Sequence, residues 1–173
     1  ITFPGAGLAV FASSEANIRW FLASASRRSI GPDKVNQLRH MRALPDESSL
    51  LALMDQYRAI IAPKFDAVHR TFDRLLAEPQ VATWTRPKGG YFISLYADGG
   101  ARRTVELAGE AGIILTPAGA AFPYGNDPGD RHIRVAPTAL SADEVGLAAE
   151  GIALAVRLAA SEREQGRRRL RTN

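Results

Sequence analysis

The sequence of 173 residues contains no cysteine and no long apolar run. Without cysteine the chain can form no disulfide, bind no metal through thiolates and use no cysteine nucleophile. A membrane-spanning helix needs about 20 consecutive apolar residues, and the first ten residues lack the basic region of a secretory signal. With 46% hydrophobic and 23% charged residues, these absences predict a soluble, globular, cytoplasmic protein with no membrane contact.

Recognised catalytic patterns are missing as well. The three histidines are widely spaced, so we expect no metal site. The sequence has no Gly-x-Ser-x-Gly elbow and no glycine-rich loop followed by Gly-Lys-Ser or Gly-Lys-Thr. The chain alone therefore completes no familiar reaction, and we expect no catalytic residue within it.

Positive charge is concentrated at the C-terminus. The net charge is +4, and residues 161–173 hold five arginines against two glutamates, which leaves the remainder nearly neutral. A basic terminus is more often a solvated tail than a binding element, so we predict a frayed basic tail over 161–173 and no nucleic-acid binding.

The first 44 residues predict a loop and two helices. Ser13 or Ser14 can cap a helix whose apolar face ends near Ile30, and Asp33 begins a shorter helix that continues to Leu44.

The longest periodic segment covers residues 47–78. Asp46 is a suitable N-cap, and apolar residues recur at helical spacing from Leu50 to Leu76. Pro63 should bend this helix because it removes a backbone donor. A helix of this length predicts a connection between two domains.

From residue 79 onward, strand and helix patterns alternate. We predict strands over 81–85 and 91–96, a helix over 102–111, a short buried strand over 113–116, a loop over 117–129 and a strand over 131–136. Ser141 and Glu144 form a capping box, with a hydrophobic staple between Leu140 and Val145, for a last helix ending near Ala160. The order is that of a small α/β layer.

Four motifs follow each other at characteristic spacing. They are Gly89-Gly90-Tyr91-Phe92, then Gly112-Ile113-Ile114-Leu115-Thr116-Pro117, then Gly119 with Phe122, and finally His132-Ile133-Arg134-Val135-Ala136. In this order the series resembles the C-terminal half of the class I and II aminotransferases of fold type I. These are enzymes that use pyridoxal 5′-phosphate (PLP).

This resemblance implies an α/β fold that is the C-terminal part of a PLP-dependent transferase. Residues 1–44 would end the large cofactor domain, 45–78 would form the long kinked connecting helix, and 79–160 would form the small α/β domain. In the family the lysine that forms the Schiff base with PLP precedes a glycine-containing turn. We therefore expect that lysine immediately before Ile1, which implies that the sequence is a fragment.

The resemblance also assigns candidate binding residues. Arg134 matches the arginine that binds the substrate α-carboxylate, a task suited to its planar fork of donors. The alternative for Arg134 is an ordinary surface residue on an edge strand. Tyr91 would face the substrate cleft or pack in the core.

Near the start of the chain, Thr2, Gly5 and Gly7 are candidates for binding the PLP phosphate. Leu8 departs from the family pattern, because many members have a phosphate-binding arginine there. Phosphate contacts would then come from upstream residues or from the partner subunit.

The departure at Leu8 points to a divergent branch. The segment from Gly31 to His40 looks like that of a subgroup with aspartate aminotransferase activity. Lys34, Asn36 or Arg39 could reach the neighbouring subunit's active site in a homodimer and select a dicarboxylate, or could be ordinary helix surface.

The resemblance implies a homodimeric aminotransferase that moves an amino group from an amino acid, such as aspartate or glutamate, to a 2-oxo acid. Three alternatives stay open. They are a PLP-dependent C–S lyase, the effector-sensing part of a winged-helix transcription regulator, and a non-enzymatic α/β interaction domain.

Overall fold

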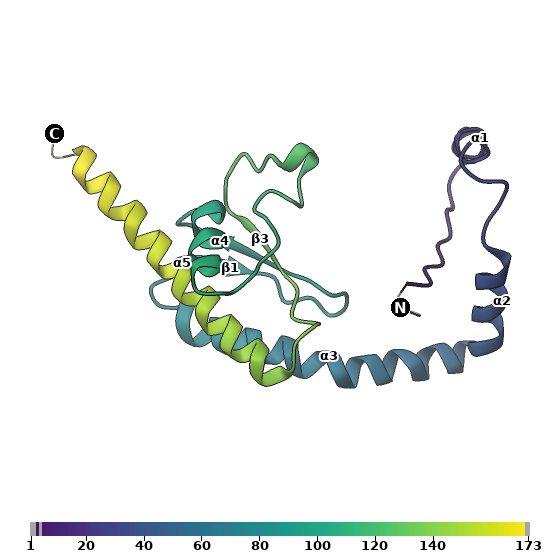
Figure 1. Ribbon diagram of the computed structural model, residues 1–173, viewed down its shortest axis with the longest axis horizontal. Coiled ribbons are helices and arrows are strands. Elements are labelled where there is room, and N and C mark those ends of the chain that lie inside the picture. The colour runs from purple at the N-terminus through teal and green to yellow at the C-terminus, as the bar shows by residue number, and fades with distance from the viewer. Residues whose placement is uncertain (1–2, 4, 172–173) are drawn as a thin grey trace. The chain divides into compact units, whose positions relative to one another are not determined.

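The computed structural model describes residue 3 and residues 5–171, and the chain divides into two compact units, residues 1–59 and 60–173 (Figure 1). The first unit holds α1, α2 and the beginning of α3. The second holds the rest of α3, a three-stranded sheet, α4 and α5.

In the first unit, the two predicted helices begin at their predicted caps. The α1 helix spans Glu15–Ala25, and the Ser14 hydroxyl accepts a hydrogen bond from the Asn17 amide at 3.4 Å. The α2 helix spans Lys34–Ala43, and the Asp33 carboxylate accepts one from the Asn36 amide at 2.9 Å. The predicted end of the first helix near Ile30 is wrong: α1 ends at Ala25, followed by a turn.

The α3 helix spans Glu47–Leu76 and crosses the boundary between the units. Asp46 caps it by accepting the Ser49 amide at 2.8 Å, and Pro63 lies inside the helix. All its buried residues lie in the C-terminal half, from Phe65 to Leu76. The predicted helix is confirmed, whereas the assignment of domains to either side of it stays a prediction.

The second unit contains an antiparallel sheet in the order β1-β2-β3, made of Ala82–Trp84, Ile93–Ala97 and His132–Val135. In its register Leu95 pairs with both Trp84 and Ile133. The α4 helix, Ala101–Glu110, lies between β2 and β3 in the chain, and a short 3₁₀ helix covers Pro123–Gly125. The final helix, α5, spans Ala142–Arg171.

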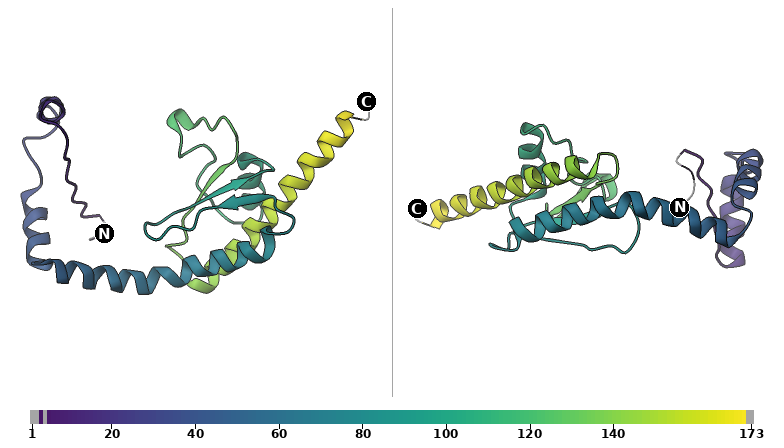
Figure 2. Two further views of the ribbon diagram at one scale, coloured as in Figure 1. Left: turned by 180° about the vertical axis from the view of Figure 1, so that it is seen from behind. Right: turned by 90° about the horizontal axis from the view of Figure 1, so that it is seen from below.

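One face of this sheet carries the core. Ile93 and Leu95 of β2 and Ile133 and Val135 of β3 are buried, in the alternation expected for a strand with one covered face. They cluster with Phe65, Val68, Phe72 and Leu76 of α3 and with Val145, Ala149, Ile152, Ala153 and Val156 of α5. Figure 2 shows the C-terminal half of α3 and α5 running beside each other.

The buried strand predicted over 113–116 is wrong. These residues form a loop, and Ile114 is 88% exposed. Gly112, at φ 81°, ends α4, and the amide of Ile113 donates back to the carbonyl of Ala108 at 2.8 Å, which ties the segment to the end of the helix. Among the described residues, the sheet has no fourth strand to pair with it.

The last helix begins as predicted and ends later. The Ser141 hydroxyl and the Glu144 carboxylate form the expected capping box, with the Ser141 amide donating to Glu144 at 2.9 Å. The helix continues past Ala160 to Arg171. Two contacts support this extension: Arg103 Nε donates to Glu162 at 2.8 Å, and Arg163 Nη1 donates to the Asp98 carbonyl at 2.6 Å. The prediction of a frayed tail is therefore wrong up to Arg171.

Candidate functional site

Arg134 lies on β3, on the face of the sheet opposite the core. Strand alternation places it there, because its neighbours Ile133 and Val135 point into the core. Its guanidinium lies over the Phe92 ring, with Cζ 4.7 Å from the ring centroid. Nη2 donates to the Thr116 hydroxyl at 3.4 Å. Three segments of the chain, β3, the approach to β2 and the loop after α4, thus meet at one cation.

Arg134 has no acidic partner within the described part of the chain. None of its nitrogens lies within 4.0 Å of a carboxylate there, and its buried Nε has no hydrogen-bond acceptor. Six other arginines of the second unit do have such partners, for example Arg103 with Glu162. A half-buried guanidinium without a counter-ion is suited to bind a carboxylate from a ligand.

Polar and aromatic side chains surround Arg134 on the same face. Ser94 is its direct partner in the register of β2 and β3, and the Ser94 hydroxyl lies 3.1 Å from His132 Nε2. The His132 ring packs against Tyr96 and Phe122, at centroid distances of 5.3 and 5.7 Å. This face is therefore polar near its centre and bordered by aromatic rings.

A turn shaped by Asp127 leads the chain into β3. Its carboxylate accepts hydrogen bonds from the backbone amides of Gly129, Arg131 and His132, at 3.0, 2.8 and 2.9 Å. These bonds, first of all the one from His132, hold the pKa of Asp127 below its ordinary value. Negative charge on Asp127 thus stabilises the start of the strand that carries Arg134.

The aromatic residue beside Arg134 is Phe92, and Tyr91, the candidate for the substrate cleft, precedes it in the chain. Tyr91 is 42% exposed, and Phe92 is 48% exposed. Sequence reasoning also missed Thr116, Ser94 and His132 as neighbours of Arg134. For His132 the signal was available, because residues two apart on a strand share a face. Phe92 and Ser94 become neighbours of Arg134 only through the register of β2 and β3. Thr116 carried no such signal, since its segment is a loop.

The candidates near the start of the chain lie in the first unit. Thr2 lies outside the described residues. Gly5, at φ 75°, and Gly7 are both exposed, and a Cβ added at either would meet nothing within 4 Å. There is therefore open space on the Cβ side of both glycines.

Asn36 is buried and holds this loop. Its Nδ2 donates to the carbonyls of Ala6 and Gly7, at 3.3 and 3.0 Å. Asn36 therefore has a structural task within its own chain. Lys34 and Arg39 are exposed on the same helix.

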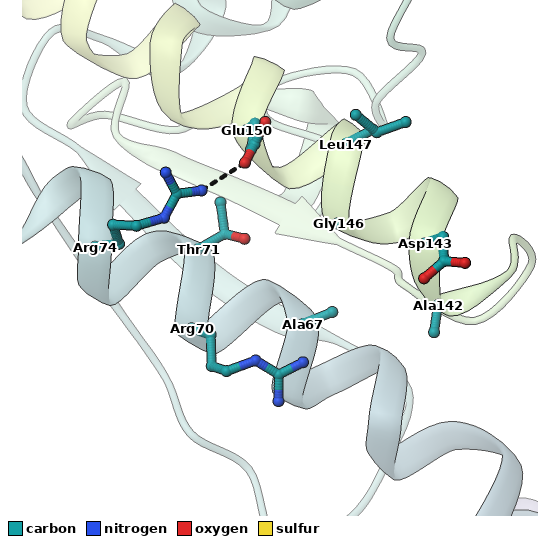
Figure 3. Close-up of a pocket in the computed structure, with 9 residues that line it drawn as sticks. All are labelled: Ala67, Arg70, Thr71, Arg74, Ala142, Asp143, Gly146, Leu147 and Glu150. Carbon is teal, nitrogen blue, oxygen red and sulfur yellow. Dashed lines mark hydrogen bonds and ion pairs between the residues drawn. The ribbon is translucent and has the colours of Figure 1, made fainter.

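A separate open hollow of about 590 Å³ lies between α3 and α5 in the second unit. Arg74 Nη2 bridges the two helices by pairing with Glu150 Oε1 at 2.5 Å, and Arg70 and Asp143 line the same hollow (Figure 3). Arg74 and Glu150 are both exposed, and solvent-exposed pairs contribute little. The hollow is charged on both walls and contains no part of the Arg134 site.

The described residues contain neither a candidate metal site nor a candidate membrane span. Over residue 3 and residues 5–171, no group of three histidine, aspartate or glutamate side chains could hold a metal ion. In the same range, none of the helices has the length and apolar character to cross a membrane.

Comparison with known proteins identifies the family. The aspartate amino-transferase family matches residues 1–168. A Mycolicibacterium smegmatis protein named as an aminotransferase is 50% identical over 163 residues, which are 94% of this chain and 38% of that protein. The crystal structure of an aspartate transaminase from Corynebacterium glutamicum has a TM-score of 0.79 and 45% identity, over 87% of this chain and 36% of that one.

A more distant structure extends the fold comparison. It is the α-aminoadipate aminotransferase LysN of Thermus thermophilus, complexed with N-(5′-phosphopyridoxyl)-L-leucine, with a TM-score of 0.69 and 18% identity. The match covers 86% of this chain and 37% of LysN, and it shows the fold alone.

The chain belongs to the aspartate amino-transferase family, and its fold is the C-terminal part of the PLP-dependent transferase fold. It spans somewhat more than a third of the length of the relatives it matches.

Proposed function

We propose that the full-length protein is a PLP-dependent aminotransferase, in which Arg134 binds the α-carboxylate of an amino acid or a 2-oxo acid. The observation that carries this proposal is the half-buried Arg134, whose guanidinium lies over the Phe92 ring and has no acidic partner in the described part of the chain. Relatives named as aminotransferases favour amino transfer over the C–S lyase and the regulator.

The chemistry of amino transfer explains why one arginine is so useful. An amino acid and the corresponding 2-oxo acid differ at Cα and share the neighbouring carboxylate. A guanidinium that binds this carboxylate through two parallel hydrogen bonds fixes the position of Cα in both halves of the reaction. Arg134 therefore orients substrate and product without exchanging a proton with either.

The donor set of the first unit fits the PLP phosphate in part. Gly5 and Gly7 are exposed, and backbone amides such as theirs are the kind of donor from which phosphate accepts hydrogen bonds. Leu8 supplies no charge, so further phosphate ligands must come from elsewhere in the full-length protein or its partner. When bound, PLP supplies an electron sink for negative charge at the substrate Cα.

The finer assignments belong to the same proposal. The aspartate transaminase of C. glutamicum, at 45% identity, supports a dicarboxylic amino acid as substrate. Exposed Lys34 and Arg39 are the candidates to recognise its second carboxylate across a homodimer. We also expect the enzyme to act in the cytoplasm.

The experiment uses the full-length protein with a panel of amino donors and 2-oxo acceptors. Removing two charge-assisted hydrogen bonds in Arg134→Ala should lower kcat/KM about 100- to 1000-fold for every substrate with an α-carboxylate. Arg134→Lys keeps the charge but loses the fork, so it should recover only part of this loss.

Cofactor binding is checked separately. Borohydride reduction of the full-length protein should attach PLP covalently to a lysine, which we expect immediately before Ile1. A wild-type protein that transfers no amino group from any donor would refute the proposal. Unchanged activity of Arg134→Ala would remove Arg134 from the substrate site.

A further inference from the structure

The aromatic ring beside Arg134 has a specific relation to the guanidinium. The structure assigns Phe92 as a positioning residue that holds Arg134 in the orientation that binds carboxylate. This inference rests on the proposed function, because it concerns the same carboxylate site. The prediction that Tyr91 faces the substrate cleft is a separate one.

The position of the Phe92 ring limits how a carboxylate can approach Arg134. Cζ of Arg134 lies 4.7 Å from the centroid of the Phe92 ring, well within the range of a cation–π contact. The ring thus occupies the space on one side of the guanidinium carbon. The N–H donors lie in the plane of the guanidinium, and a carboxylate that accepts two parallel hydrogen bonds approaches in that plane.

The described residues offer the Arg134 guanidinium few polar partners. The bond from Nη2 to the Thr116 hydroxyl is long, at 3.4 Å, and the buried Nε has no acceptor. No carboxylate in the described residues lies within 4.0 Å of the guanidinium. The long arginine side chain thus depends on the Phe92 ring for its orientation.

Loss of the ring should weaken substrate binding and leave the chemical step nearly unchanged. If only a fraction of the molecules hold Arg134 in the orientation that binds carboxylate, the apparent affinity for substrate equals the intrinsic affinity multiplied by that fraction. A partly desolvated cation–π contact corresponds to a change of about 5- to 30-fold. Since Arg134 grips the carboxylate equally before and during reaction, we expect this change in KM and little change in kcat.

The test compares ring-removing and ring-keeping variants of the full-length holoenzyme. Phe92→Leu should raise KM about 5- to 30-fold for amino acid and 2-oxo acid alike. Phe92→Tyr and Phe92→Trp keep a ring and should stay within about threefold of wild type. Tyr124→Leu, at a fully exposed aromatic residue of the same unit, is the matched control and should change neither constant.

A double-mutant cycle with Arg134→Ala separates positioning from general damage. In the Arg134→Ala background the penalty of Phe92→Leu should disappear, because there is no guanidinium left to orient. A penalty that persists there, or one that falls on kcat with a lowered melting temperature, would overturn the inference in favour of a structural role.

Tyr91→Leu distinguishes the two neighbouring aromatic residues. A rise in KM that occurs in Tyr91→Leu and not in Phe92→Leu would also overturn the inference. If the wild type transfers no amino group, the proposed function fails. If the wild type is active and Phe92→Leu has a normal KM, only the inference about Phe92 fails.

Discussion

A single methyl group added at Gly99 should push the connection between β2 and α4 away from α5. Gly99 lies in the connection between β2 and α4. A Cβ built there would lie 2.3 Å from the backbone nitrogen of Ala160 and 2.4 Å from the carbonyl carbon of Ala159, both in α5. These are backbone atoms of a helix, so no side chain can rotate away to make room.

The magnitude follows from two opposing effects. Overpacking of this kind costs about 1–3 kcal/mol. The alanine also restricts the unfolded chain, which offsets about 0.4–1 kcal/mol. We therefore expect Gly99→Ala to destabilise the second unit by about 1–2 kcal/mol. Gly146→Ala is the control on α5, because its Cβ would meet nothing within 4 Å, and it should stabilise the helix by about 0.5–1 kcal/mol.

Hydrogen exchange of α5 peptides measures both effects in the full-length protein. Under conditions where exchange reports the opening equilibrium, Gly99→Ala should speed the slowest α5 peptides about 5- to 30-fold. Gly146→Ala should slow them about 2- to 5-fold. Unchanged exchange in Gly99→Ala, with the control behaving as expected, would refute the close contact between this connection and α5.

Three further outcomes are expected. Phe72→Ala removes a fully buried ring that contacts Trp84 and should cost about 3–5 kcal/mol in denaturant unfolding. Backbone hydrogen bonds lower the pKa of Asp127, so the stabilisation by its carboxylate should be complete at pH values above the ordinary pKa of 3.8 and be lost as the pH falls further. Asp127→Asn should flatten this acid dependence in a pH series of melting temperatures. Burial, and then the charge of Arg86, lowers the pKa of His69, so the free energy of unfolding should fall as the pH drops below the ordinary pKa of 6.5. A His69→Gln variant whose stability falls just as steeply with pH would contradict this.

The helices of this chain were predictable because their signals are local. Ser14, Asp33, Asp46 and Ser141 all cap helices, and each is a short polar residue directly before a periodic segment. Such caps depend on neighbours three residues away. The sequence therefore contained all the information needed to place the starts of these helices.

The errors occurred where contacts between distant segments decide the structure. The Ile113–Thr116 segment has the composition of a strand, yet the sheet offers it no neighbour among the described residues. The α5 helix continues beyond Ala160 because Glu162 and Arg163 bind residues more than 50 positions earlier in the chain. Periodicity contains no information about either effect.

The candidate site shows the same division. Arg134 could be singled out from its motif, and its placement opposite the core follows from strand alternation. The ring that stacks on it could not be chosen between Tyr91 and Phe92 without the register of β2 and β3, which pairs Ser94 with Arg134. Register depends on which face of each strand becomes buried.

The alternation along β2 and β3 also bears on how such a protein can diversify. Ile93, Leu95 and Ile133 are buried in the core and stabilise the unit, whereas their neighbours Ser94 and His132 face away from the core. Substitutions on the outer face can change which substrate binds while the free energy of unfolding stays nearly constant. A change of specificity therefore needs no compensating substitution in the core. A library limited to that face would sample new substrate preferences from a population that remains folded.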